Sequence, residues 1–210
     1  MDIAIYLFDG ITALDAVGPY EVLARLPDAR VRFVGETVGP ARTDNGALAL
    51  MCDVARSDVE RADLLLIPGG FGTRGLEGDE PVLDWIRSMD ETTTTTMSVC
   101  TGSMLLAAAG LLEGREATTH WASLERLAEY AAIPTSRRVV TSGKYVTAAG
   151  VSSGIDMALR YAADVFGDEL AMTLQLGIEY DPDPPFDCGS VGKAPPAIEQ
   201  AIRQRFAERE

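Results

Sequence analysis

The stretch from Thr94 to Leu112 does most to limit the folds that are open to this chain. Residues 95–99 have the threonine-rich and apolar character of a strand, and residues 101–109 are helix formers that follow without a linker until Gly110. Cys100 stands at the junction. A strand that becomes a helix within one or two residues makes a sharp turn, so the sequence predicts a nucleophile elbow with sulfur in place of the usual serine oxygen.

The predicted position of Cys100 gives a physical reason for reactivity. A free thiol has a pKa of about 8.5, so little of it is thiolate at neutral pH. Unpaired amide N–H groups and the helix dipole favour an anion at a helix N-terminus, and we therefore expect the pKa of Cys100 to be lowered. The same amides, with a second donor from a nearby loop, could stabilise charge on a substrate. The competing interpretation is a small buried core residue, since free cysteine is often buried.

The length and composition predict one globular domain over residues 1–210, because 47% of the residues are apolar. The sequence contains no run of 18 apolar residues, and its N-terminus has an acidic second residue and no basic segment. We therefore expect neither a membrane span nor a signal peptide. Three scattered cysteines, Cys52, Cys100 and Cys188, are too few for a disulfide framework or a zinc site and indicate a reduced, cytoplasmic protein.

The formal net charge of −14 arises from 32 acidic and 18 basic residues. This balance argues against nucleic acid and against an anionic membrane as partners. It does not indicate a cationic substrate, because the acidic residues are spread along the whole chain. We expect a strongly solvated acidic surface and a small-molecule substrate.

Apolar segments with strand and helix character alternate along the chain. Strands are expected at residues 2–8, 29–38, 62–68, 92–99 and 116–119, with hairpins at 41–50 and 137–148. Helices are expected at residues 15–26, 80–89, 101–109, 120–132, 153–166, 169–176 and 195–209. This alternation predicts a doubly wound α/β fold with a mostly parallel sheet.

In such a sheet, ligands bind beyond the carboxyl ends of the strands. The loops 8–15, 68–72, 100–101 and 148–153 are expected to meet there. Asp15 would bring a carboxylate beside the thiol, and its pKa would rise if it lies close to a thiolate; the alternative role is a helix cap. His120 is the only histidine, and spacing alone is weak evidence for a Cys–His pair.

The glycine-rich segment IPGGFGTRG follows the apolar run 62–68. Its glycine spacing does not match a dinucleotide-binding fingerprint, and it lacks the Gly-Lys-Ser/Thr of a Walker loop. Backbone amides that donate to a developing oxyanion fit this loop better.

Four segments in this order, IPGG, SVCTGS, ATTHW and AAGVSSGID, resemble the ThiJ/PfpI superfamily. Within it, residues 14–23 (LDAVGPYEVL) and 179–186 (EYDPDPPF) are similar to the isonitrile hydratase branch. The resemblance covers nearly the whole chain. It implies a flavodoxin-like doubly wound sandwich, related to class I glutamine amidotransferases, with a cysteine on a nucleophile elbow. It also implies a homodimer that works without a metal or organic cofactor.

The resemblance further implies roles for particular residues. Cys100 would be the nucleophile, Asp15 the acid and base, and Thr101 a third catalytic residue beside them. The predicted substrate or oxyanion residues are the glycines Gly69, Gly70 and Gly150. His120 matches the superfamily histidine but is second-tier, because the hydratase branch does not use it in a triad.

The expected reaction is hydration of an isonitrile to an N-substituted formamide through a covalent thioimidate on Cys100. One alternative is glyoxalase- or deglycase-like chemistry on α-oxoaldehydes through a hemithioacetal. Another is a non-catalytic redox sensor whose cysteine is oxidised. A transcription regulator is disfavoured, because the chain is acidic and leaves no room for a DNA-binding segment before Glu210. The Pro-, Asp- and Gly-rich segment 181–192 is expected to be a solvated loop, with a lid role left open.

Overall fold

The computed structural model describes residues 1–208 and divides the chain into two compact units. The first unit runs from Met1 to Ile178, and the second begins at Glu179. Helix α7 (Pro196–Ala207) belongs to the second unit and matches the helix expected at the C-terminus, whose last expected residue, Arg209, lies outside the described residues. The expectation of a single domain over 1–210 stays a prediction.

The first unit is built on a seven-stranded sheet with the order β10-β11-β7-β6-β1-β2-β5. Every neighbouring pair is parallel except β10 and β11, which form an antiparallel hairpin. The strand bounds are β1 Asp2–Tyr6, β2 Arg30–Gly35, β5 Val54–Ala55, β6 Leu64–Ile67, β7 Thr95–Val99, β10 Val139–Ser142 and β11 Tyr145–Ala148. The predicted doubly wound α/β fold, flavodoxin-like and mostly parallel, is confirmed.

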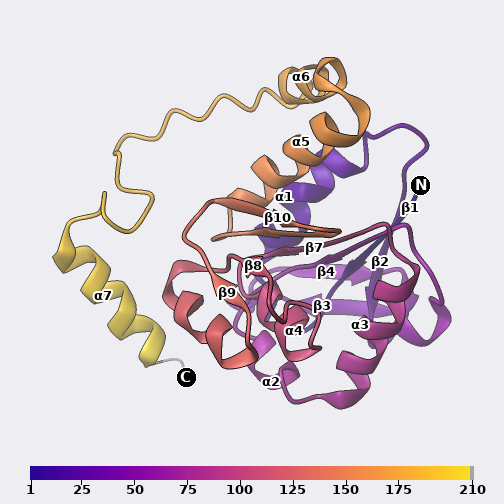
Figure 1. Cartoon of the computed structure of the whole chain (residues 1–210), viewed down its shortest axis with the longest axis horizontal. Coiled ribbons are helices and arrows are strands. Elements are labelled where there is room, and N and C mark those ends of the chain that lie inside the picture. Colours follow the sequence, from indigo (N-terminus) through magenta and orange to yellow (C-terminus); the bar gives the residue numbers. More distant parts are fainter. Residues whose placement is uncertain (209–210) are drawn as a thin grey trace. The chain divides into compact units, whose positions relative to one another are not determined.

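Helices cover both faces of this sheet (Figure 1). Helices α1 (Ala13–Leu23) and α5 (Ser153–Phe166) pack against each other on one face, and α3 (Glu80–Thr92) and α4 (Gly102–Ala108) lie on the other. The remaining helical segments are α2 Thr73–Leu76, α6 Asp168–Gly177 and the 3₁₀ segments η1 Arg56–Asp58 and η2 Trp121–Tyr130. Within residues 1–208, no helix combines the length and the apolar character needed to cross a membrane.

Two small sheets flank the large one. Strands β3 (Gly39–Arg42) and β4 (Ala49–Cys52) form the antiparallel hairpin that the sequence predicted near residues 41–50. Strands β8 (Glu116–Ala117) and β9 (Ile133–Pro134) form a short parallel pair.

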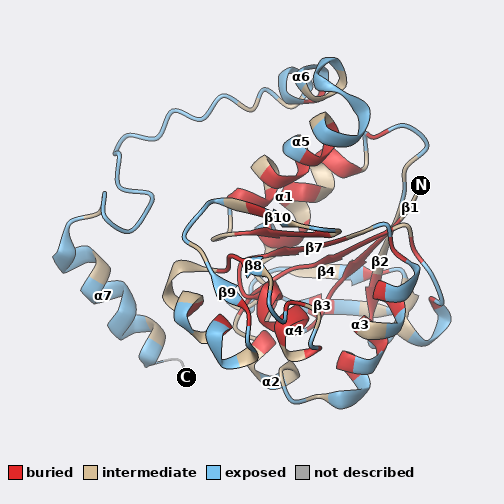
Figure 2. Cartoon of the chain, viewed as in Figure 1, coloured by how far each residue is buried: buried red, intermediate tan, exposed pale blue. Residues whose placement is uncertain are grey.

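The core lies along the central strands, which are buried on both faces (Figure 2). All four residues of β6 are fully buried, as expected for the continuous apolar run at 62–68. The parallel register places the ends of β6 and β7 side by side, because Ile67 pairs with Ser98, and Ala148 of β11 pairs with Val99 on the other side of β7. The loops after these strands therefore start next to one another.

Two local expectations are corrected. Helix α1 begins at Ala13 with Thr12 as its N-cap, so Asp15 lies in the first turn and is not the cap, and Pro19 lies in the helix interior. Gly154 of α5 lets the two helices approach at this point, because a Cβ there would lie 3.1 Å from Pro19 Cδ. The segment expected as a helix at 120–132 forms 3₁₀ turns over Trp121–Tyr130, and the first of them has the Ser123 N–H bonded to the His120 carbonyl oxygen three residues earlier.

Candidate functional site

The sharp turn expected at Cys100 is present between the end of β7 and the start of α4. Cys100 has a φ of 56°, in the left-handed region that residues other than glycine rarely adopt. Gly102 makes the turn possible, because a Cβ at that position would lie 2.0 Å from the carbonyl oxygen of Ile67. The first turn of α4 therefore sits directly on the end of β6.

The backbone of Cys100 is held from both sides. Its N–H lies 3.0 Å from the carbonyl oxygen of Ala148 and 2.8 Å from that of Ala149. Its carbonyl oxygen accepts hydrogen bonds from Thr119 Oγ1 at 2.8 Å and from Ser103 Oγ at 3.1 Å. These contacts stabilise a conformation that is strained for cysteine. The sequence analysis did not single out Thr119, because no local pattern links it to a carbonyl group 19 residues earlier.

Asp15 is fully buried and brings its carboxyl group to the thiol of Cys100. The Gly69 N–H donates to Asp15 Oδ2 at 3.0 Å, whereas Oδ1 has no partner with hydrogen-bond geometry among the described residues. Burial raises the pKa of Asp15 to about 7, although the bond from Gly69 and the interaction with the thiol both favour the carboxylate. A carboxyl group in this environment titrates near neutral pH.

The pKa of the Cys100 thiol is raised well above its usual range, which corrects the expectation that the helix N-terminus would lower it. Burial is the largest cause, and the charge of Asp15 is the next. The backbone N–H groups of Thr101 and Val151 interact with the sulfur and lower the pKa, but they do not outweigh burial. Above pH 7 the pair therefore holds one proton, which resides on the sulfur.

Two of the three glycines expected as substrate or oxyanion residues use their amides within the protein. The N–H of Gly69 donates to Asp15, and the N–H of Gly70 donates to Thr101 Oγ1 at 3.0 Å. Their oxyanion role is not supported, because each N–H already has its acceptor. Gly69 serves the site through its small size: a Cβ there would lie 2.5 Å from the Thr101 nitrogen and 2.9 Å from Asp15 Oδ2. The N–H of Val151, which the sequence analysis missed, is a donor on the sulfur.

Gly150 and His120 lie next to each other at the edge of this cluster. A Cβ at Gly150 would lie 3.1 Å from Cδ2 of the histidine ring. His120 Nδ1 accepts a hydrogen bond from the Ala122 N–H at 3.3 Å, so the ring proton belongs on Nε2. Burial and the charge of Arg74 lower the pKa of His120 to about 4, which leaves the ring neutral at pH 7. The roles of Gly150 and His120 stay predictions.

The arrangement brings together a nucleophile and a proton carrier. The sulfur of Cys100 faces two backbone N–H groups, and the Asp15 carboxyl beside it can exchange a proton near neutral pH. Within the part of the chain that the structure describes, no three His, Cys, Asp or Glu side chains group closely enough to hold a metal ion. Cys100 and Asp15 are therefore suited to the addition of a thiol to a small electrophile, in which the carboxyl group takes the thiol proton and then passes it to the product.

Comparisons with known proteins agree with this fold. The isonitrile hydratase of Pseudomonas putida is 42% identical over 207 residues, which cover 99% of this chain and 90% of that protein. The HTH-type transcriptional regulator CdhR of Pseudomonas aeruginosa is 34% identical over 137 residues, which cover 64% of this chain and 40% of the regulator. The crystal structure of a ThiJ/PfpI family protein from Pseudomonas syringae matches with a TM-score of 0.94 at 36% identity, over 99% of this chain and 86% of that chain.

Most of the chain also matches a known protein family. Residues 1–164, which contain Asp15, Cys100 and His120, match the DJ-1/PfpI family. This range includes every strand of the seven-stranded sheet. The fold, the turn at Cys100 and these matches together place the chain in the DJ-1/PfpI family.

Proposed function

We propose that this protein hydrates an isonitrile to the corresponding N-substituted formamide, with Cys100 as the nucleophile and Asp15 as the acid and base. The observation that carries the proposal is the buried Asp15 carboxyl, whose pKa of about 7 lets it accept and return a proton at neutral pH. The 42% identity to the isonitrile hydratase of Pseudomonas putida supports the substrate class.

In the first half of the reaction, the Asp15 carboxylate accepts the thiol proton as the sulfur attacks the terminal carbon of R–NC. A carbon–sulfur bond forms, and Asp15 then delivers the proton to the same carbon. The product is a thioimidate, R–N=CH–S–Cys100. The step adds an S–H group to one carbon atom, so it needs no oxidant or reductant.

In the second half, Asp15 is again ionised and removes a proton from water, whose oxygen adds to the thioimidate carbon. The imine nitrogen receives the proton from Asp15. The hydroxyl group on the carbon then loses its proton to Asp15, the carbon–sulfur bond breaks, and R–NH–CHO is released. The departing sulfur carries negative charge until Asp15 reprotonates it, and the N–H groups of Thr101 and Val151 stabilise that charge.

A substrate comparison tests the reaction class. The purified protein is assayed with a para-substituted phenyl isocyanide and with methylglyoxal, and the products are separated by chromatography. We expect the formamide as product and a kcat/KM for the isonitrile at least about 10²-fold above that for methylglyoxal. Preference for methylglyoxal would instead support hemithioacetal chemistry. Turnover of neither substrate, with a stable Cys100 sulfinate by mass spectrometry, would support a redox sensor.

The pH dependence of kcat/KM tests the role of Asp15. Below its pKa of about 7, Asp15 is protonated and cannot accept the thiol proton, so we expect kcat/KM to fall about tenfold per pH unit. Above pH 7 the profile should stay level, because burial keeps the pKa of the Cys100 thiol well above its usual range. The measurement is a rate profile from pH 5 to pH 9 with a stability check at each end. A rate that climbs steadily between pH 7 and pH 9 would show that free thiolate is the reactive form.

A further inference from the structure

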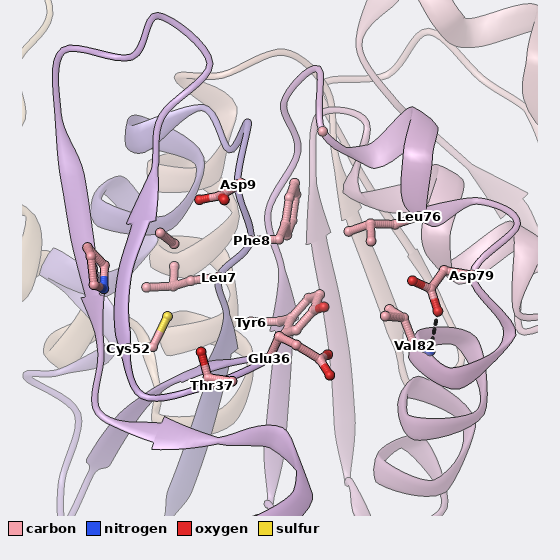
Figure 3. A pocket seen from close by; sticks show the side chains of 13 residues that line it. Tyr6, Leu7, Phe8, Asp9, Glu36, Thr37, Cys52, Leu76, Asp79 and Val82 are labelled. Carbon is pink, nitrogen blue, oxygen red and sulfur yellow. Dashed lines mark hydrogen bonds between the residues drawn. The ribbon is translucent and has the colours of Figure 1, made fainter.

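A pocket of about 300 Å³ lies between the β3–β4 hairpin and the segment that carries α2 and the start of α3 (Figure 3). It opens beside the end of β1, and none of the catalytic residues proposed above lines it. Its volume is at the lower end of the range for small-molecule sites.

The charged groups that line this pocket are all acidic. They are Asp9, Glu36 and Asp79, and no lysine, arginine or histidine lines it. Glu36 pairs with Arg56, which does not line the pocket. Asp9 and Asp79 each accept a hydrogen bond from a backbone N–H, and neither forms an ion pair within residues 1–208. Two carboxylates thus line the pocket without an ion pair of their own among the described residues, although the charge of Arg56 outside the lining interacts with Asp79.

Two largely buried side chains bring a hydroxyl and a thiol to the wall of the pocket. Tyr6 is 1% exposed and Cys52 is 3% exposed, yet both line the pocket, and the causes of the Tyr6 pKa shift include no hydrogen bond to its hydroxyl. Figure 3 shows Tyr6 between Cys52 and Asp79. The Tyr6 hydroxyl is therefore available to donate a hydrogen bond to a ligand in the pocket or to accept one from it.

The charges near Tyr6 and the apolar walls of the pocket indicate which kind of ligand it can bind. Burial raises the pKa of Tyr6 well above its usual range; the charge of Arg56 partly opposes this, and the charges of Glu36 and Asp79 add to it. The walls include Phe8, whose ring centroid lies 5.6 Å from that of Tyr6, and aromatic faces attract cations. A metal ion does not fit, since no three ligating side chains in the described part of the chain converge.

We propose that this pocket binds a small organic cation, namely a primary ammonium group on an apolar alkyl or aryl body. The ammonium donates to the carboxylate of Asp79 and to the hydroxyl oxygen of Tyr6. The apolar body packs against Phe8 and Leu76. The proposal does not depend on the reaction at Cys100.

Isothermal titration calorimetry at about 0.15 M salt, where distant charges are largely screened, tests the proposal. The probes are 2-phenylethylamine, 2-phenylethanol and 3-phenylpropanoate, which share a phenyl body and differ in charge. We expect saturable binding of the amine, binding of the alcohol at least about tenfold weaker, and none for the carboxylate. Equal binding of amine and alcohol, or no saturable binding of the amine up to 10 mM (roughly the weakest affinity of interest), would overturn the proposal.

Matched variants locate the binding. Asp79→Asn should weaken amine binding about fivefold or more, because it removes the charge while its amide oxygen can still accept the Val82 N–H that caps α3. Tyr6→Phe should weaken it about threefold. Asp84→Asn removes the same charge from an exposed site on α3 and should leave binding within about twofold.

Two further variants complete the test. Asp9→Asn provides a second charge removal should Asp79→Asn fold poorly, and it can keep the hydrogen bond from the Arg42 N–H. Cys100→Ala should bind the amine as the unaltered protein does, whatever the outcome of the isonitrile assay. An equal loss in Asp84→Asn and Asp79→Asn would mean unspecific attraction to an acidic protein, and loss in Cys100→Ala would place the amine at the other site; either result would contradict the proposal.

Discussion

Asp15→Asn is expected to lower kcat/KM for an isonitrile by about 10²–10⁴-fold, the range lost when a general acid–base is removed. The amide has the size of the carboxyl group, and its oxygen can still accept the Gly69 N–H that now binds Oδ2. It cannot take the thiol proton or return it to carbon, however. The measurement is steady-state kinetics at pH 7.5, with Cys100→Ala as the variant that loses turnover completely.

The same substitution raises the free energy of unfolding at pH 8. The pKa of Asp15 is about 7 in the folded protein against an ordinary value of 3.8, so the folded state holds this proton more tightly. The stability that the protonated group contributes is complete below pH 4 and is lost as the pH rises to about 7. A difference of about three pKa units corresponds to about 4 kcal/mol, and asparagine avoids this loss because it carries no charge.

Thermal unfolding at pH 5 and pH 8 measures the effect of Asp15→Asn on stability separately from its effect on activity. A gain of about 4 kcal/mol corresponds to roughly 10 °C in Tm for a chain of this size. We expect this gain at pH 8 and a smaller one at pH 5. Asp84→Asn, an exposed acid on α3, should change neither Tm nor kcat/KM appreciably. An Asp15→Asn protein that keeps more than about a tenth of the activity would exclude the acid–base role.

We expect Gly102→Ala to destabilise the protein by about 3 kcal/mol or more and to remove most of the proposed activity. The new Cβ would lie 2.0 Å from the Ile67 carbonyl oxygen and 2.7 Å from that of Pro68. Both obstacles are backbone atoms of a buried strand end, so α4 has to move away from β6. Such a shift displaces Cys100, and a displacement of about 1 Å can cost about 10²-fold in rate.

Gly75→Ala is the matched control for this substitution. Gly75 also lies in a helix, α2, but nothing stands within 4 Å of a Cβ built on it. Alanine should be neutral there or stabilise the helix by up to about 1 kcal/mol. Chemical denaturation of both variants measures the difference. Equal stability of the two would mean that α4 can separate from β6 without loss.

The fold and the chemical groups of the candidate site can be predicted from motifs and local sequence patterns alone. The apolar run at 62–68 and the strand-to-helix junction at Cys100 are local features, because they depend on backbone preference and on the spacing of apolar residues. Both appear in the structure as expected. Cys100 and Asp15 were therefore placed at the ends of neighbouring elements from the sequence alone.

The properties of those groups required the tertiary structure. The helix N-terminus predicted a lowered thiol pKa, but burial and the charge of Asp15, which comes from a different element, raise it. The amides of Gly69 and Gly70 looked available, yet they bond to Asp15 and Thr101. A pKa and a hydrogen-bond partner depend on desolvation and on residues distant in sequence, which no local pattern encodes.

The acidic pocket illustrates the same division. The sequence determined an excess of acidic residues spread along the chain, and from that spread no cationic ligand followed. Only the folding of β1, the β3–β4 hairpin and the start of α3 around one cavity brought Asp9, Asp79 and the buried Tyr6 hydroxyl together. The sequence by itself therefore determined most of the secondary structure, the fold class and the chemical groups of the candidate site. Tertiary structure decided which groups meet and how they ionise, because burial and contact are properties of packing.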